Sequence, residues 1–225
     1  MGQAIGQVLS FGVGVALSPF PIVAVVLMLA TPRAGSNGPA FLLGWLAGMA
    51  IVGGIVLAVS DGADASTDGA PADWVSWLKI VLGVVLVLVA ARQWRRRPQG
   101  GVVPEMPGWM RTLDTFTAPK ALGAGALLSG VNPKNLLLIV AAAAAIAQTG
   151  ASTGSEIVAL AVFAAIGSLG VGAPVVIYVA MGDRSAHILG SLKDWMSRNN
   201  VAIMAVLCLV IGAKLVGDAV TALAA

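Results

Sequence analysis

Two short motifs place polar residues and prolines inside apolar runs that are otherwise typical of membrane helices. The first is Ser18-Pro19-Phe20-Pro21, and the second is Asn132-Pro133-Lys134-Asn135. A helix from Lys120 to Lys134 would be roughly 20 Å long at about 1.5 Å per residue, so a Lys120 at one membrane surface puts Lys134 near the midplane. A charge at that depth is costly, and we expect it to have a function.

The prolines predict that both helices break, because proline lacks a backbone donor and clashes with the preceding helical turn. Ser18 and Asn132 are good N-cap residues, and Pro19 and Pro133 suit the first position of a new half-helix. Each new half-helix would present free N–H groups and the positive end of its dipole to the membrane interior. Together with the Lys134 ammonium, two such ends would attract a phosphate, a sulfate or a carboxylate.

We therefore predict a midplane site for an anionic substrate that uses the polar residues and prolines of both motifs: Ser18, Pro19, Pro21, Asn132, Pro133, Lys134 and Asn135. The alternative is that the prolines only kink the helices, since neighbouring helices can satisfy the freed backbone groups. We expect no enzyme, bound metal or cofactor. No carboxylate lies in the middle of a predicted span, the single histidine (His187) falls in a predicted loop, and no Walker pattern is present.

The composition predicts an all-α integral membrane protein. Of the 225 residues, 58% are hydrophobic and only 10% are charged, and a soluble domain could not keep its surface polar with that balance. Several apolar runs of about 18 or more residues are long enough to cross a bilayer as helices. We predict six spans, at residues 5–30, 41–60, 75–91, 121–147, 157–181 and 201–219.

The charges of the loops predict the orientation of these spans. Lysine and arginine gather in the first, third and fifth loops, and the third contains Arg95-Arg96-Arg97. The loop between the second and third spans instead carries Asp61, Asp64, Asp68 and Asp73 and no base. The positive-inside rule places the basic loops in the cytoplasm and both termini outside. The net charge of +3 is then a topological signal, and we expect no nucleic-acid partner.

The two halves of the chain resemble each other. Aligning Ser18-Pro19 with Asn132-Pro133 brings the glycines of the second span near those of the fifth, and Gly83 falls at a depth similar to Gly212. Each half has three spans, an odd number, so the second repeat must be inverted. Paired broken helices in an inverted repeat indicate the binding site of a transporter.

The predicted organisation is therefore two inverted three-helix repeats, with the first helix of each repeat broken at proline. The first repeat covers residues 1–92 and the second covers residues 119–225. A basic cytoplasmic linker at 93–118, rich in proline, glycine and arginine, joins them.

These features resemble the lysine-exporter (LysE) superfamily: six spans, a basic central loop, Ser-Pro-Phe-Pro in the first span and Gly-Val-Asn-Pro-Lys-Asn in the fourth. Within it, the chain is similar over essentially its whole length to the glycolipid-addressing branch, the peptidoglycolipid-addressing (GAP) and sulfolipid-addressing (Sap) proteins. The resemblance implies a multi-pass protein of the bacterial inner membrane that exports cell-envelope glycolipids, with membrane lipids and the glycolipid as partners. It supplies no established catalytic residues. A redox-relay branch requires paired cysteines, whereas this chain has only Cys208.

Three functions are compatible with these observations. The first is a transporter that exports or flips an anionic amphiphile or glycolipid, the second is a small-solute exporter of the amino-acid type, and the third is a non-transporting assembly partner of an envelope-lipid machine. A side opening wide enough for acyl chains favours the first, and a closed, water-filled central cavity favours the second. An occluded centre with an exposed face of small residues favours the third. Both a homo-oligomer and a larger machinery are compatible with the sequence.

Overall fold

A computed structural model of the chain describes residues 2–62, 66–67, 70–71, 73–95 and 115–224. The described residues of the first half form four helices: α1 (Gly2–Ala16), α2 (Pro19–Leu29), α3 (Ala34–Gly62) and α4 (Asp73–Arg95). Those of the second half form five: α5 (Ala118–Gly130), α6 (Pro133–Ala147), α7 (Thr153–Gly167), α8 (Leu169–Met181) and α9 (Ala186–Leu223). A 3₁₀ turn, η2 (Gly182–Ser185), precedes α9. One departure from the all-helical prediction is the short antiparallel pairing of β1 (Ser66–Thr67) with β2 (Ala70–Pro71) between α3 and α4.

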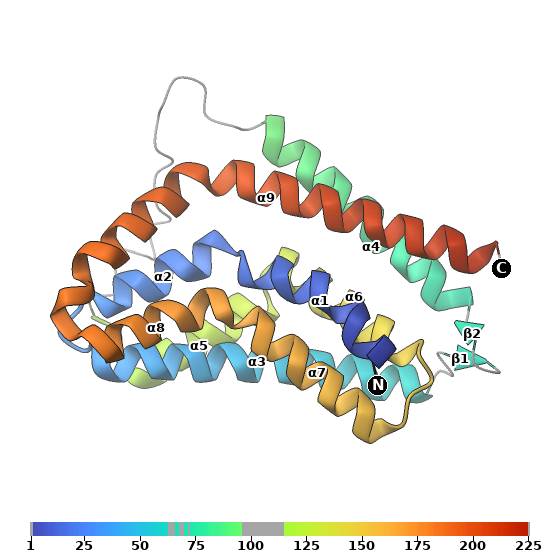
Figure 1. Cartoon of the computed structure of the whole chain (residues 1–225), viewed down its shortest axis with the longest axis horizontal. Helices are drawn as coiled ribbons and strands as arrows, with labels where there is room; N and C mark the ends of the chain where they lie inside the picture. The colour runs from blue at the N-terminus through green and yellow to red at the C-terminus, as the bar shows by residue number, and fades with distance from the viewer. Residues whose placement is uncertain (1, 63–65, 68–69, 72, 96–114, 225) are drawn as a thin grey trace.

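The described residues form three helices that are long and apolar enough to cross a membrane alone, namely α3, α4 and α9. Three bent pairs also pass the length and hydropathy test: α1–α2 bends by 47°, α5–α6 by 64° and α7–α8 by 60°. In Figure 1, each pair has one half toward the end of the molecule where both termini lie and the other half toward the opposite end. The chain is therefore a multi-pass membrane protein, with six spans if each bent pair counts as one.

Two of the bends fall at the sequence motifs. α2 begins at Pro19 and α6 begins at Pro133, so each half-helix has proline at its first position. Proline fits this position because the first N–H groups of a helix have no intrahelical partner to lose. The residues before them, Ser18 and Asn132, have the non-helical backbone of N-cap residues.

The third bend, in the fifth predicted span, is not anticipated from the sequence. It lies at Ser168, whose hydroxyl donates to the carbonyl of Ala164 at 2.6 Å. Just beyond it, a Cβ atom at Gly170 would lie 1.8 Å from the Ala16 carbonyl oxygen, so only glycine allows α8 to approach α1 this closely. The bend therefore occurs where two helices from different halves come into backbone contact.

The sixth predicted span, residues 201–219, is part of a longer helix. α9 has 38 residues, and its early turns pack on α2 while it also pairs extensively with α4. His187, expected in a loop, consequently lies exposed in the first turn of α9. The predicted linker (93–118) lies largely outside the described residues, because α4 ends at Arg95 and the description resumes at residue 115.

α6 lies at the centre of the bundle, in contact with α1, α3, α4 and α7. Its alanines from Ala141 to Ala145 are at most 2% exposed, and their small side chains allow neighbouring helices to approach. The principal helix pairs join the two halves of the chain: α3 with α5, α4 with α9 and α1 with α7. Close backbone approach accompanies this packing, since a Cβ atom at Gly44 of α3 would lie 1.9 Å from the Leu122 carbonyl oxygen of α5.

Candidate functional site

The Lys134 side chain connects the two proline-centred breaks. Lys134 lies in the first turn of α6 and is only 5% exposed. Its ammonium donates to the carbonyl oxygen of Gly14, near the end of α1, at 2.6 Å. It also donates to the Ser18 hydroxyl, which lies in the break between α1 and α2, at 2.8 Å.

Ser18 and Asn135 extend this contact to α5. The Ser18 hydroxyl donates to the Asn135 side-chain oxygen at 2.8 Å, and the Asn135 amide donates to the Leu128 carbonyl at 3.0 Å. Both side chains are buried, at 3% and 0% exposure. Asn132 caps α6, because its side-chain oxygen accepts from the Lys134 backbone N–H at 3.2 Å. We call the hydrogen-bonded group the break network: Gly14, Ser18, Leu128, Lys134 and Asn135.

The electrostatics of the break network include a helix end that the sequence does not predict. Lys134 lies in the first turn of α6 and its ammonium contacts Ser18, the N-cap residue of α2, but the ammonium also contacts the C-terminal end of α1. The last carbonyls of a helix have no intrahelical partner and carry the negative end of its dipole, so they attract a cation. The Lys134 ammonium thus has neutral hydrogen-bond acceptors in Gly14 and Ser18, both weaker acceptors than an anionic oxygen.

The three prolines of the predicted site shape the backbone at the breaks and contribute no polar side-chain atom to the break network. Pro19 and Pro21 are buried in the first turn of α2, whereas Pro133 is exposed at the start of α6. The structure therefore joins three of the predicted residues through their side chains: Ser18, Lys134 and Asn135.

Two members of the break network were not found from the sequence because they contribute only carbonyl oxygens. Leu128 gives no sequence signal, since any residue can supply a carbonyl. Gly14 gives a weak one. A Cβ atom there would lie 2.4 Å from the terminal methyl group of Ile211 in α9, so glycine lets α1 and α9 meet beside Lys134 without a shift of that side chain.

A second buried lysine was also missed. Lys79, in α4, is 5% exposed and donates to the side-chain oxygen of Gln148, the C-cap residue of α6. The Gln148 amide nitrogen has no hydrogen-bond partner among the described residues. A third lysine, Lys214 of α9, instead has a charged partner, since its ammonium lies 2.6 Å from a carboxylate oxygen of Asp218 one turn further on.

An apolar groove of about 400 Å³ lies beside the first break. Its walls come from α1, α2, α7, α8 and α9, and they include Ala16, Leu17, Ile22, Leu169 and Met196. Leu17 is 41% exposed and Leu169 is 63% exposed, so the groove opens at the side of the bundle. We call it the side groove.

Apolar spans, three bent helix pairs and a buried lysine between two of the bends define a polytopic helical membrane protein with an internal polar site. A family model described as "Sap, sulfolipid-1-addressing protein" matches residues 8–221. The chain therefore belongs to the sulfolipid-1-addressing protein family, which confirms the resemblance to the glycolipid-addressing proteins. Comparisons with curated proteins and with solved structures give no match.

Proposed function

We propose that this protein moves an anionic amphiphile of the envelope-glycolipid class across the bacterial inner membrane, through a site between its two proline-centred breaks. The observation that carries the proposal is the proximity of the side groove to the break network. Ala16 and Leu17, which line the groove, come directly before Ser18, and the Ser18 hydroxyl binds Lys134. An amphiphile needs these two environments, an apolar one for its chains and a cationic one for its headgroup.

The headgroup would bind Lys134 by replacing its neutral acceptors. Hydrogen bonds from an ammonium to an anionic oxygen are roughly twice as strong as those between neutral groups. A phosphate, sulfate or carboxylate can therefore compete with the Gly14 carbonyl and the Ser18 hydroxyl. The break network in the structure would then represent the closed state, and substrate binding would separate the two breaks.

The side groove favours a lipid over an amino acid as the substrate, and the outer face of α3 argues against an assembly partner. The side groove has apolar walls and faces the surrounding bilayer, which suits acyl chains better than an amino acid. An assembly partner would present an exposed face of small residues. The outer face of α3 instead carries large aliphatic side chains that are 58–63% exposed, namely Leu43, Ile51, Ile55 and Val59.

The proposed architecture is six spans in two inverted repeats, residues 1–92 and 119–225, joined by a cytoplasmic linker. The pairing of helices between the halves supports it, as does the contact of α4 with α9. There, a Cβ atom at Gly83 would lie 2.8 Å from the Gly212 carbonyl oxygen, and one at Gly212 would lie 2.7 Å from that of Gly83. Such reciprocity is expected where a pseudo-two-fold axis passes between two related helices.

Transport by the purified protein in vesicles tests this function. We expect a fluorescent anionic lipid to cross the bilayer faster with the protein than without it, as measured by the fraction of label that an external quencher destroys over time. A zwitterionic lipid with the same label and chains should cross at least several-fold more slowly. If neither lipid moves faster than in empty vesicles while a labelled amino acid does, the protein is a small-solute exporter. If nothing moves, the transport proposal fails.

A further inference from the structure

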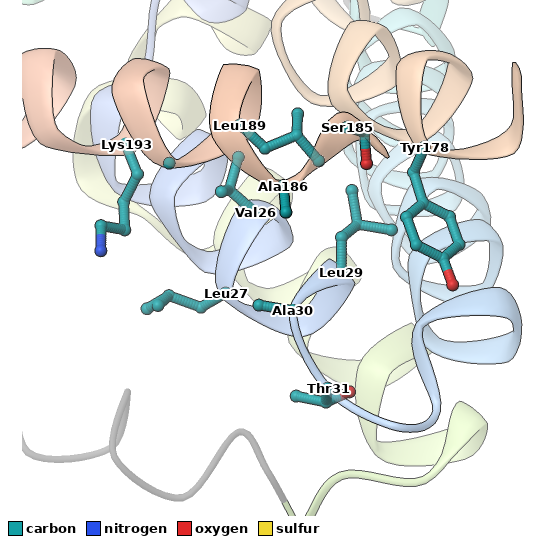
Figure 2. Close-up of a pocket in the computed structure, with 11 residues that line it drawn as sticks. Val26, Leu27, Leu29, Ala30, Thr31, Tyr178, Ser185, Ala186, Leu189 and Lys193 are labelled. Atoms are coloured by element: carbon teal, nitrogen blue, oxygen red, sulfur yellow. The ribbon is translucent and has the colours of Figure 1, made fainter. Parts of the chain in front are cut away.

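A second cavity lies between the C-terminal end of α2, α8 and the first turns of α9, and has a volume of about 280 Å³. Figure 2 shows α9 residues along one side of this cavity and α2 residues along the other. It lies near the loop that contains Arg33 and near η2. These belong to the first and fifth loops, so the cavity is at the basic end of the bundle. We call it the basic-end pocket.

The basic-end pocket combines an apolar middle with polar ends. Val26 and Leu29 of α2 and Leu189 of α9 lie in its middle, and each is almost fully buried. Lys193 and Tyr178 lie at opposite ends (Figure 2). An acyl glycerol or sugar ester has this same alternation of apolar and polar groups.

The pocket leaves a cation available to a ligand. The hydroxyls of Thr31 and Ser185 donate to carbonyls in their own turns, at 2.8 and 2.6 Å, so they are satisfied internally. The Lys193 ammonium lies 3.3 Å from Asp194, but their side chains are 29% and 59% exposed, and such a surface ion pair contributes little. An anionic group can therefore recruit Lys193, and the Tyr178 hydroxyl can donate to a second polar group of the ligand at the opposite end of the pocket.

The basic-end pocket and the side groove share walls. α2, α8 and α9 line both, and on α9 Leu189 and Lys193 face the pocket while Leu192 and Met196 face the groove. Residues three and four apart lie on neighbouring positions of a helix surface, so one stretch of α9 borders both spaces. A chain that starts at Lys193 can follow α9 toward the first break.

From these observations we propose that the basic-end pocket is a docking site for a membrane lipid with an anionic headgroup, taken from the leaflet at the basic end. Lys193 binds the headgroup, and the side groove receives an acyl chain. This inference rests on the proposed function, because it supplies the position from which the substrate enters. The ligand is a lipid of the bilayer, since both the basic-end pocket and the side groove open among membrane-spanning helices.

Gly190 offers a way to close the pocket without disturbing the fold. It lines the pocket, and a Cβ atom there would have no other atom within 4 Å, so Gly190→Leu has room for its side chain. Gly217 lies on the same helix, is equally open and lines neither cavity, so Gly217→Leu is a matched control. Lys193→Gln removes the cation and keeps most of the volume, and the exposed Lys120 of α5 supplies its control, Lys120→Gln.

The test uses the full chain in phosphatidylcholine vesicles that contain a trace of photoactivatable phosphatidylglycerol, or of photoactivatable phosphatidylcholine with the same chains. Labelled peptides are then mapped by mass spectrometry. We expect phosphatidylglycerol to label residues 26–31 and 186–193 at least threefold more than phosphatidylcholine does. Gly190→Leu should reduce this labelling about fivefold, and Lys193→Gln should reduce it to the phosphatidylcholine level. Gly217→Leu and Lys120→Gln should label like the parent.

Equal labelling by the two lipids overturns the role of the headgroup, and undiminished labelling of a folded Gly190→Leu protein overturns the docking site. Labelling requires no transport, so Lys134→Met should label like the parent even though its transport falls. If labelling fails while lipid translocation persists, the docking inference falls and the proposed function stands. If labelling succeeds and translocation is absent, the proposed function fails and the lipid site remains.

Discussion

At the scale of single residues, two side chains of the break network bind backbone carbonyls beside the helix interruptions. The Leu127 carbonyl accepts from the N–H of Asn132 at 3.2 Å, and the next carbonyl, that of Leu128, accepts from the Asn135 side chain. The Lys134 ammonium does the same for the Gly14 carbonyl at the end of α1. In lipid, unsatisfied backbone groups cost several kcal/mol. The side chains that form the proposed substrate site therefore also hold the closed structure together.

Replacement of Asn135 by leucine tests this structural role. Asn135→Leu keeps the branched shape of the side chain but leaves the Ser18 hydroxyl without its acceptor and the Leu128 carbonyl without its donor, which should destabilise the protein by about 1–3 kcal/mol. Thermal unfolding of the purified protein in detergent measures the effect. Asn199→Leu is the control, because the Asn199 amide bonds to a carbonyl of its own helix at the protein surface. Equal midpoints for the two variants would show that the break network contributes nothing to stability.

At the scale of helices, the sequence predicts interruptions where a residue type causes them and misses those caused by packing. Pro19 and Pro133 each follow a residue suited to the N-cap, so two of the three bends fall where the motifs indicate. By contrast, Pro39 and Pro174 lie inside continuous helices. The bend at Ser168 occurs where Gly170 meets the Ala16 carbonyl, which depends on a helix from the other half of the chain. For the same reason, the buried lysine at the site could be predicted but its Gly14 partner could not.

The packing of α3 on α5 makes a prediction at this scale. Gly44→Ala would place a methyl group 1.9 Å from the Leu122 carbonyl oxygen, so the two helices must separate. Overpacking of this kind costs about 1–3 kcal/mol. Gly54→Ala, on the same helix, meets no other atom within 4 Å and should unfold at or slightly above the parent temperature. A Gly44→Ala protein as stable as Gly54→Ala would contradict the close approach of α3 and α5.

At the scale of the whole molecule, the fold places both termini toward one end and the first and fifth loops at the other. The N- and C-termini lie toward the same end in Figure 1, and the loops before α3 and before α9 lie at the opposite end. The proposed six spans, an even number, would require this arrangement, and the positive-inside rule predicts that the basic end is cytoplasmic. The basic-end pocket would consequently open toward the cytoplasmic leaflet. An envelope lipid that is made inside the cell would enter from that leaflet.

Reporter fusions test this orientation. Alkaline phosphatase, which is active only outside the cytoplasm, should be active when fused after Ala225. It should be inactive when fused within the linker, after Arg97. A fluorescent protein that matures only in the cytoplasm should give the opposite pattern at the two positions. A cytoplasmic C-terminus would reverse the proposed direction of transport.

Lipid translocation by Lys134 variants tests the central claim most directly. Lys134→Met preserves the length of the side chain and removes its charge, and Lys134→Arg preserves the charge with a different geometry. In the vesicle assay at matched protein density, Lys134→Met should move the anionic lipid about tenfold more slowly than the parent, which corresponds to roughly 1.4 kcal/mol of lost headgroup binding. Lys134→Arg should retain part of the rate, and the slow movement of the zwitterionic lipid should be unchanged in both. A Lys134→Met protein that moves the anionic lipid at the parent rate would show that the lysine is structural and that the substrate does not bind between the breaks.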